Sequence, residues 1–302
     1  MQLWDIETGQ LQHTLEGHKS SVWSAAFSHD SRLLASGSTD HTVRLWDTAT
    51  GQLQHTLEGH TGGVWSAAFS HDSKLLASAP CEAKIVLLWD TTTGQLQKTL
   101  YGHTNDIPSV AFSHDSKLLA SGSLDNTVRL WDAVTGKLRK TLEGHKNGIL
   151  SVTFSHNSEL LASTSMGHTI RLWDVATGQL QQSLWGHSND ISSAIFSHNS
   201  KLLASASIDR TVRIWDTATG QLERALIGHK DSVWSVTFSH DSKLLASASE
   251  DHTIRLWNTA TGKLHQTLRG HEDGVRLVTF SYDSSLLASA SRDSTFKFWE
   301  NC

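Results

Sequence analysis

The sequence predicts an all-β protein, a seven-bladed β-propeller, from three observations. The dipeptide Gly-His recurs seven times along the 302 residues, at a spacing of 42 residues with one step of 43. A tryptophan followed by Asp, Asn or Glu comes after each Gly-His. Each unit also contains short strand-like runs separated by turn residues, and none shows the period of an amphipathic helix. Units of this length cannot bury both faces alone, so they must stack on their neighbours.

The first complete unit shows how the strands follow one another. Its strand-like runs are residues 22–28, 33–38, 42–47 and 52–57. Turn-forming residues separate them, as in His29-Asp30-Ser31 and Thr50-Gly51. Four antiparallel strands per unit, arranged radially, leave only short and protected sheet edges. This arrangement is the propeller.

We expect one domain over residues 1–302, with blades that begin near residues 18, 60, 103, 145, 187, 229 and 271. The last unit ends at Trp299-Glu300, its third strand, without a fourth. Residues 10–15, which precede the first Gly-His, are therefore predicted to complete the last blade and close the propeller. Residues 1–5 then form a surplus partial repeat, because they duplicate a third strand that residues 295–300 already supply. The surplus suggests a piece of a longer repeat array.

The sequence motifs of the repeats resemble those of a known family. The segments FSHDSKLLASAS and TVRLWD, with the seven Gly-His pairs and the seven pairs of Trp with Asp, Asn or Glu, resemble the WD40 repeat family over essentially the whole chain. The resemblance implies a propeller that holds partners on one rim, the top face. The near-identical repeats are also similar to the arrays of fungal NOD-like heterokaryon-incompatibility proteins, in which an NTPase module precedes the WD40 repeats.

His18, Ser36 and Asp40 invite comparison with a Ser-His-Asp catalytic triad. The resemblance to WD40 repeats implies instead that they form a buried structural tetrad with Trp46. The set recurs in five units, and five copies of one active site are implausible. The five tetrads are His18, Ser36, Asp40 and Trp46; His103, Ser121, Asp125 and Trp131; His187, Ser205, Asp209 and Trp215; His229, Ser247, Asp251 and Trp257; His271, Ser289, Asp293 and Trp299.

The second and fourth blades depart from this pattern. Gly167 stands where the fourth blade would have its aspartate, and residues 78–83 of the second blade carry an extra residue and no aspartate in register. We expect His60 and His145 to lack their usual partner. A buried network that loses one member is destabilised by about 1–3 kcal/mol, so these blades are predicted to be the weak ones.

Composition excludes several classes of function. The 25 basic and 30 acidic residues give a net charge of −5, which provides no basic footprint for nucleic acid. Two cysteines favour a reducing compartment, and the sequence shows no signal peptide and no apolar run of the ~20 residues that span a bilayer. We expect a monomeric cytoplasmic protein without membrane insertion. No phosphate loop or metal motif occurs, so we expect no enzyme activity, cofactor or metal.

Six of the 19 histidines lie in the turn between the first and second strands of a blade. Spread around a ring, they are predicted to be solvated turn residues too far apart to share a metal ion. A pH-sensitive ring of charge is the alternative, because imidazoles titrate near pH 6.5. These histidines are His29, His71, His114, His156, His198 and His240.

Comparison of the seven units shows that variation is concentrated at one end of each blade. The variable positions flank the first strand, precede the tetrad aspartate, or precede Gly-His. Tryptophan and arginine at such positions are typical of interface hot spots. The predicted partner-binding residues are Trp23, Trp65, Asp106, Pro108, Leu150, Met166, Trp185, Asp190, Ile208, Trp234, Glu250, Arg276 and Arg292.

Trp23 shows the choice between two interpretations. An indole at the start of a strand can be half-buried padding, but Pro108 and Ser192 fill the same position in other units, so packing does not require an indole. We therefore interpret these tryptophans as binding residues of a non-enzymatic scaffold for a protein or peptide. Two alternatives remain: the ligand-sensing array of a NOD-like signalling NTPase, and an adaptor such as a mitochondrial-fission or G-protein β-like subunit.

Overall fold

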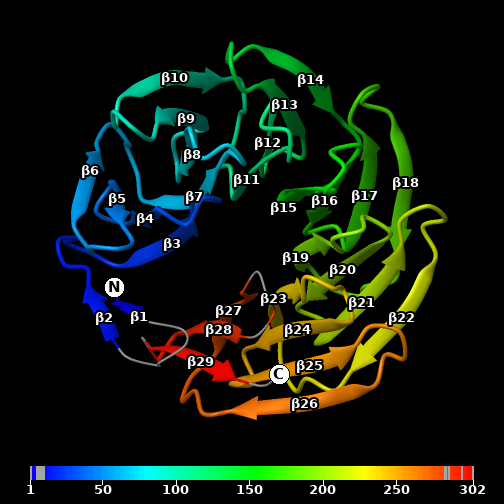
Figure 1. Cartoon of the computed structure of the whole chain (residues 1–302). Coiled ribbons are helices and arrows are strands. Elements are labelled where there is room, and N and C mark those ends of the chain that lie inside the picture. The colour runs from blue at the N-terminus through cyan, green and yellow to red at the C-terminus, as the bar shows by residue number, and fades with distance from the viewer. Residues whose placement is uncertain (1, 5–10, 282–283, 285, 294, 301–302) are drawn as a thin grey trace. The chain divides into compact units, whose positions relative to one another are not determined.

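The computed structural model describes residues 2–4, 11–281, 284, 286–293 and 295–300 (Figure 1). They form strands connected by turns, and no helix occurs among them. No segment of this described part is a helix of the length and apolarity that a membrane span requires. The chain divides into two compact units, Met1–Val152 and Thr153–Cys302.

The first unit contains the strands of the first three blades, preceded by a short hairpin. In chain order they are β1 (Gln2–Trp4), β2 (Leu11–Thr14), β3 (Val22–Phe27), β4 (Leu33–Ser38), β5 (Val43–Asp47), β6 (Leu53–Leu57), β7 (Val64–Phe69), β8 (Leu75–Pro80), β9 (Ile85–Asp90), β10 (Leu96–Tyr101), β11 (Ser109–Phe112), β12 (Leu118–Gly122), β13 (Val128–Asp132) and β14 (Leu138–Leu142).

The division between the units falls within β15 (Ile149–Phe154). The later strands are β16 (Leu160–Ser165), β17 (Thr169–Asp174), β18 (Leu180–Trp185), β19 (Ile191–Phe196), β20 (Leu202–Ser207), β21 (Thr211–Asp216), β22 (Leu222–Ile227), β23 (Val233–Phe238), β24 (Leu244–Ser249), β25 (Thr253–Asn258), β26 (Leu264–Arg269), β27 (Val275–Phe280), β28 (Leu286–Ser291) and β29 (Phe296–Glu300).

Consecutive strands pair in antiparallel order to form one sheet per repeat. Among the described residues, six sheets have four strands, from β3–β6 to β23–β26, and β27–β29 form a sheet of three. The strands of the first repeat match the predicted runs to within one residue at either end. The predicted fold class, an all-β seven-bladed propeller, is confirmed.

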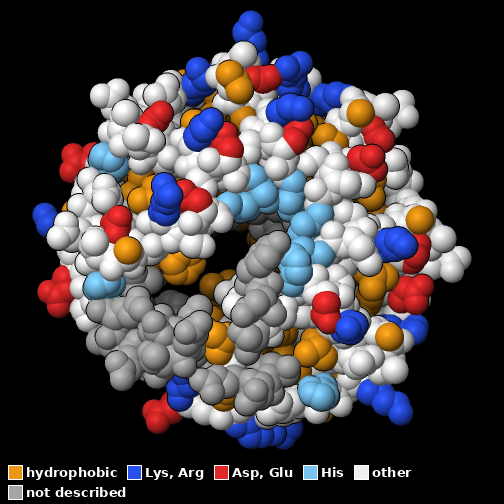
Figure 2. Space-filling view, viewed as in Figure 1, with side chains coloured by type: hydrophobic (Ala, Val, Ile, Leu, Met, Phe, Trp, Pro, Cys, Tyr) orange, Lys and Arg blue, Asp and Glu red, His pale blue; other side chains and the backbone are white. Residues whose placement is uncertain are grey.

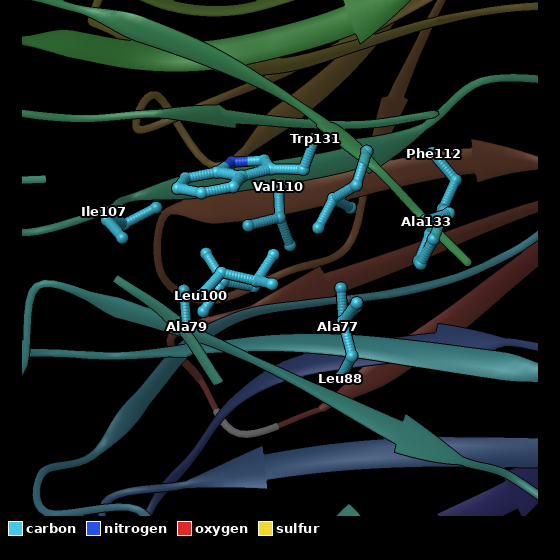
Figure 3. Packing of buried hydrophobic residues seen from close by; sticks show 11 residues of the cluster. Ala77, Ala79, Leu88, Leu100, Ile107, Val110, Phe112, Trp131 and Ala133 are labelled. Atoms are coloured by element: carbon cyan, nitrogen blue, oxygen red, sulfur yellow. The ribbon is translucent and has the colours of Figure 1, made fainter. Parts of the chain in front are cut away.

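The hydrophobic core lies between consecutive sheets. In the first unit, Leu88 and Leu100 of the β7–β10 sheet pack with Val110 and Trp131 of the β11–β14 sheet. Figure 3 shows these side chains pointing toward one another from the two sheets. In the second unit, Ile214 of the β19–β22 sheet shares a cluster with residues of the β23–β26 sheet. Within each unit, consecutive repeats therefore bury their apolar faces against each other, as the stacking argument requires.

The predicted closing strand has a different partner in the structure. β2, within the predicted range 10–15, pairs with β1, where Gln2 lies opposite Thr14 and Leu3 opposite His13. In the described residues, the last sheet has only the three strands β27–β29. The last sheet belongs to the other compact unit, so the closure of the last blade by this strand stays a prediction. A hairpin between neighbouring strands closes a short loop, which costs less chain entropy than pairing distant segments.

Candidate interaction rim

In the first, second, third, fifth, sixth and seventh blades, the two variable loops lie side by side. In the first blade, the backbone N–H of Thr39 donates to the carbonyl of Ser21 over 2.9 Å. The same bond joins Leu124 to Asp106 over 2.8 Å and Glu250 to Ser232 over 2.9 Å. This hydrogen bond holds the residue before the tetrad aspartate next to the residue before the first strand. Equivalent bonds occur at Cys81–Gly63, Ile208–Asp190 and Arg292–Gly274.

The tetrads link these loops to the blades through a chain of hydrogen bonds. In the first blade, the Trp46 indole N–H donates to Ser36 Oγ over 2.8 Å, and Ser36 Oγ lies 2.8 Å from His18 Nε2. His18 Nδ1 is 2.8 Å from Asp40 Oδ2. Because the carboxylate only accepts, Nδ1 carries the proton and Nε2 accepts from the serine hydroxyl. The tetrads of the third, fifth, sixth and seventh blades repeat these contacts at 2.7–3.0 Å.

Each tetrad aspartate is ionised and satisfied. Burial by itself would raise the pKa of Asp125, but hydrogen bonds from His103, Thr127 and the Thr104 N–H outweigh it and hold the pKa well below its usual range. The serine is fully buried in the same network, since Ser121 has 0% exposure. A substrate carbonyl has no access to a hydroxyl in this position, so the arrangement serves to hold the loops.

The second blade keeps only part of the network. Trp89 and His60 both hydrogen-bond to Ser78 Oγ over 2.8 Å, but the buried Nδ1 of His60 has no hydrogen-bond partner among the described residues. Burial lowers the pKa of His60 to about 4, and the backbone carbonyls of His41 and Leu57 offset this only in part. His60 is therefore a neutral buried imidazole at pH 7.

Restoring an aspartate in the fourth blade is expected to stabilise the protein. Gly167 has no left-handed φ, so it accepts a side chain. An aspartate there is positioned to accept from Thr169, as Asp40 accepts from Thr42 over 2.7 Å. We expect Gly167→Asp to raise the free energy of unfolding by about 1 kcal/mol or more in urea titration. Gly167→Ala is the control, and equal stability of the two variants would contradict the prediction.

An arginine on the third strand makes a structural contact that is not part of the predicted tetrads. The guanidinium of Arg44 lies 5.9 Å from the ring centroid of Trp46, within the range of a cation–π contact. Gly17 has a φ of 143°, in the left-handed region that favours glycine, which explains the glycine of Gly-His. In the second blade Leu87 replaces the arginine, yet Gly59 keeps a left-handed φ of 128°. The sequence signal for this contact is the arginine of the TVRLWD segment, two residues before the tryptophan.

In the first unit, the structure brings Trp23 and Trp65 together. Their ring centroids are 6.3 Å apart with planes tilted by 40°, within the range of favourable aromatic pairs. Both remain open to solvent, with 53% of Trp23 and 38% of Trp65 exposed. They form an exposed aromatic pair across two consecutive repeats.

Three further rim residues of the first unit are half-buried: Asp106, Pro108 and Leu150. Asp106 supports a neighbouring loop, because its carboxylate accepts the backbone N–H of Glu82 over 2.9 Å. This bond helps to order the irregular loop of the second blade, where Glu82 has a φ of 63°.

In the second unit, four predicted residues form a tight cluster. Glu250 accepts the Trp234 indole N–H over 2.8 Å and an Arg292 N–H over 2.7 Å, and lies 3.3 Å from the Arg276 guanidinium. Arg276 also stacks on Trp234, 3.8 Å from the ring centroid. Desolvation lowers the pKa of Arg276, and Glu250 acts against that shift. Trp234 is thus half-buried and engaged on both its face and its N–H.

The remaining predicted residues of the second unit are separate. Asp190 lies 3.6 Å from the His168 imidazole, and Ile208 is half-buried beside it through its backbone bond. Met166 is 41% exposed, and Trp185 is 67% exposed at the end of β18. No contact joins Met166 or Trp185 to the Trp234 cluster in the described part of this unit.

The turn histidines differ from the prediction. In the first unit, the ring centroids of His29 and His71 are 3.6 Å apart, and those of His71 and His114 are 4.0 Å apart. Figure 2 shows histidine side chains lying side by side on this face. The predicted wide separation is wrong, because the first strands of consecutive repeats bring the turns into contact, while His29 stays exposed and His71 and His114 are half-buried. Among the described residues, no group of three or more His, Cys, Asp or Glu is arranged to hold a metal ion.

Comparison with known proteins gives a family match and two short local similarities. The description "WD domain, G-beta repeat" matches residues 9–47, 51–90, 94–132, 136–174, 178–216, 220–258 and 262–300. A 42-residue segment is 52% identical to the periodic tryptophan protein 2 homolog of Schizosaccharomyces pombe, covering 14% of this chain and 5% of that protein. A 36-residue segment is 56% identical to the WD repeat-containing protein SL1-17 of Schistosoma mansoni, covering 12% of each. These matches span a small part of either relative.

Proposed function

Because the chain belongs to the WD40 repeat family, we propose that it is a non-enzymatic scaffold that binds a protein or peptide on its rim loops. The observation that carries the proposal is the exposed pair Trp23 and Trp65. Two indoles in contact offer a large apolar surface with few rotatable bonds, so little conformational entropy is lost when a partner packs on them.

The tryptophans proposed as anchors differ in how accessible their side chains are to a partner. Trp23 and Trp65 are exposed, whereas Trp234 is already stacked under Arg276 and bonded to Glu250. A partner that used Trp234 would first have to displace these contacts. We therefore assign the principal anchors to the first unit and a charge-selecting role to Arg276 and Arg292. The proposal includes a monomeric protein located in the cytoplasm.

The burial of the tetrads supports a non-enzymatic role. Each tetrad serine accepts an indole N–H, as Ser205 does from Trp215 over 2.9 Å, and is buried. The repetition of the set in five blades fits a structural purpose shared by the blades. What varies between repeats is the rim, which is the pattern expected of a recognition surface.

The test is to select binders from a random peptide library displayed on phage and to measure the affinity of one selected peptide. We expect Trp23→Ala and Trp65→Ala each to weaken binding by about 2 kcal/mol, roughly 30-fold in Kd. Val134→Ala is the matched control, because Val134 is 74% exposed but lies in a turn after β13. Unchanged affinity in both tryptophan variants, with weakened binding in the control, would overturn the proposal.

A second candidate is the ligand-sensing array of a NOD-like signalling NTPase. It is favoured by repeats that share a nearly constant frame while their rim positions change, as at Trp23, Pro108 and Arg276. Such an array would bind variable ligands and pass the signal to the NTPase. Rim substitutions would then lower the affinity of the selected peptides in the same way. In a fusion of this chain to an NTPase module, the rate of NTP turnover would depend on the peptide.

A further inference from the structure

The turn histidines form two rows, one in each unit. The row of the first unit is His29, His71 and His114, described above. In the second unit, His198 lies between His156 and His240, with ring centroids 4.2 and 4.1 Å apart. His198 is half-buried, and its Nδ1 is shielded from solvent without a hydrogen-bond partner in the described residues. Each row therefore consists of imidazoles contributed by consecutive repeats and packed ring against ring.

The backbone beside these rings also joins consecutive repeats. The N–H of His198 donates to Ser242 Oγ over 3.1 Å, and the N–H of Asn157 donates to Ser200 Oγ over 3.3 Å. The serines have a left-handed φ near 58°, which aims the hydroxyl at the preceding repeat. In the first unit, the N–H of Asp30 donates to Ser73 Oγ over 3.2 Å. The rows thus lie at a joint that each repeat makes with the next.

The charged groups around the two rows differ. In the first unit an aspartate follows each histidine: Asp30 beside Arg32, Asp72 beside Lys74, and Asp115 beside Lys117. In the second unit Asn157 and Asn199 replace two of these aspartates, and only Asp241 remains, 3.3 Å from Lys243. The other charged residues of these turns are Glu159, bonded to Asn157 over 2.6 Å, and Lys201.

Protonation of a row places like charges in contact. Desolvation, together with the smaller effect of the neighbouring imidazoles His156 and His240, lowers the pKa of His198 to about 4. In the first unit, desolvation lowers the pKa of His29 while the Asp30 carboxylate raises it. A histidine whose folded-state pKa is depressed binds protons better when its surroundings open. Stability is full above pH 6.5 and is lost as the pH falls toward 4.

We propose that the histidine rows are acid-sensitive joints between consecutive repeats, and that the row of His156, His198 and His240 is the more sensitive. At neutral pH the uncharged rings pack and hold the turns together. On acidification the rings repel one another, and the turns of the second unit separate first because His156 and His198 are followed by the uncharged Asn157 and Asn199, whereas each histidine of the first row is followed by an aspartate. The joint gives this propeller a local response to acid that is independent of the rim.

The test is hydrogen–deuterium exchange of the whole chain at pH 7.5 and pH 5.0, corrected for intrinsic exchange and followed by mass spectrometry. We expect the opening equilibrium of residues 193–245 to rise by about tenfold on acidification, and that of residues 109–122, which contain His114 and exclude the buried His60, to rise less. His198→Tyr, which keeps a ring and removes the titration, is expected to abolish most of the rise. Tyrosine is the residue that the last repeat carries at this position in the sequence.

Two further variants complete the design. Asn157→Asp with Asn199→Asp restores the carboxylates of the first unit and is expected to reduce the rise in residues 193–245 while keeping all three histidines. His265→Tyr removes an exposed histidine outside the row and is expected to leave the rise unchanged. An equal rise in both segments, or a rise in residues 193–245 unaffected by both His198→Tyr and the double variant, would overturn the proposal.

Discussion

Trp131→Ala is expected to lower the free energy of unfolding by about 3–5 kcal/mol. The indole is 2% exposed and packs between two sheets with Leu88 and Val110. Its removal leaves a large cavity in the interface between the second and third blades. It also deprives Ser121 of its N–H donor and Arg129 of the ring 5.9 Å away. Urea unfolding followed by circular dichroism measures the loss.

Trp185→Ala provides the control for this prediction. The same atoms are removed, but Trp185 is 67% exposed, so the change is expected to stay within about 0.5 kcal/mol. Trp131→Phe separates the two contributions, because it keeps much of the packing and removes the N–H. A stability of Trp131→Ala equal to that of Trp185→Ala would show that the interface between the blades contributes little to folding.

His60 is expected to make the protein less stable in acid. Burial lowers the pKa of His60 to about 4 from 6.5, so protonation favours the unfolded chain. Its contribution is fully present above pH 6.5 and is lost as the pH falls from 6.5 toward 4. The linkage relation gives a loss of about 2 kcal/mol at pH 5. The measurement is the free energy of unfolding of the wild type and His60→Gln across this range.

Because His60→Gln cannot titrate, it is expected to lose less stability than the wild type between pH 7 and pH 5. His265→Gln controls for the loss of one exposed histidine and is expected to follow the wild type. The Cε1 proton shift of His60 gives a direct measure, with an expected midpoint near pH 4. A midpoint near 6.5 would show that the imidazole is solvated and would contradict the prediction.

The strands could be predicted because each rests on local sequence. Alternating residues, turn residues and a repeat of fixed length place β3, β4, β5 and β6 to within one residue. The pairing of β2 could not be predicted in the same way. Residues 1–5 and 295–300 present equivalent third strands, so the sequence offers β2 two partners of similar chemistry. The choice depends on loop entropy and on the packing of distant segments, which no local pattern records.

The rim positions were also predictable, because the antiparallel order puts both loops at one end of the blade. Their contacts were not. Trp23 and Trp234 occupy equivalent positions, yet one is exposed and the other is covered by Arg276 from the next repeat. The histidine rows were missed for the same reason. Contact between His156 and His198 depends on the spacing of adjacent sheets, which the sequence of one repeat does not contain.

The interfaces between sheets have a consequence for how the protein can change over generations. Equivalent residues build each interface, as Trp131, Trp215 and Trp257 do in three different clusters. Genetic exchange between two repeats therefore swaps one buried surface for its near copy and leaves folding intact. What such recombination alters is the set of side chains displayed outside the core. The architecture allows new specificities to arise by shuffling, without a separate search for a stable fold.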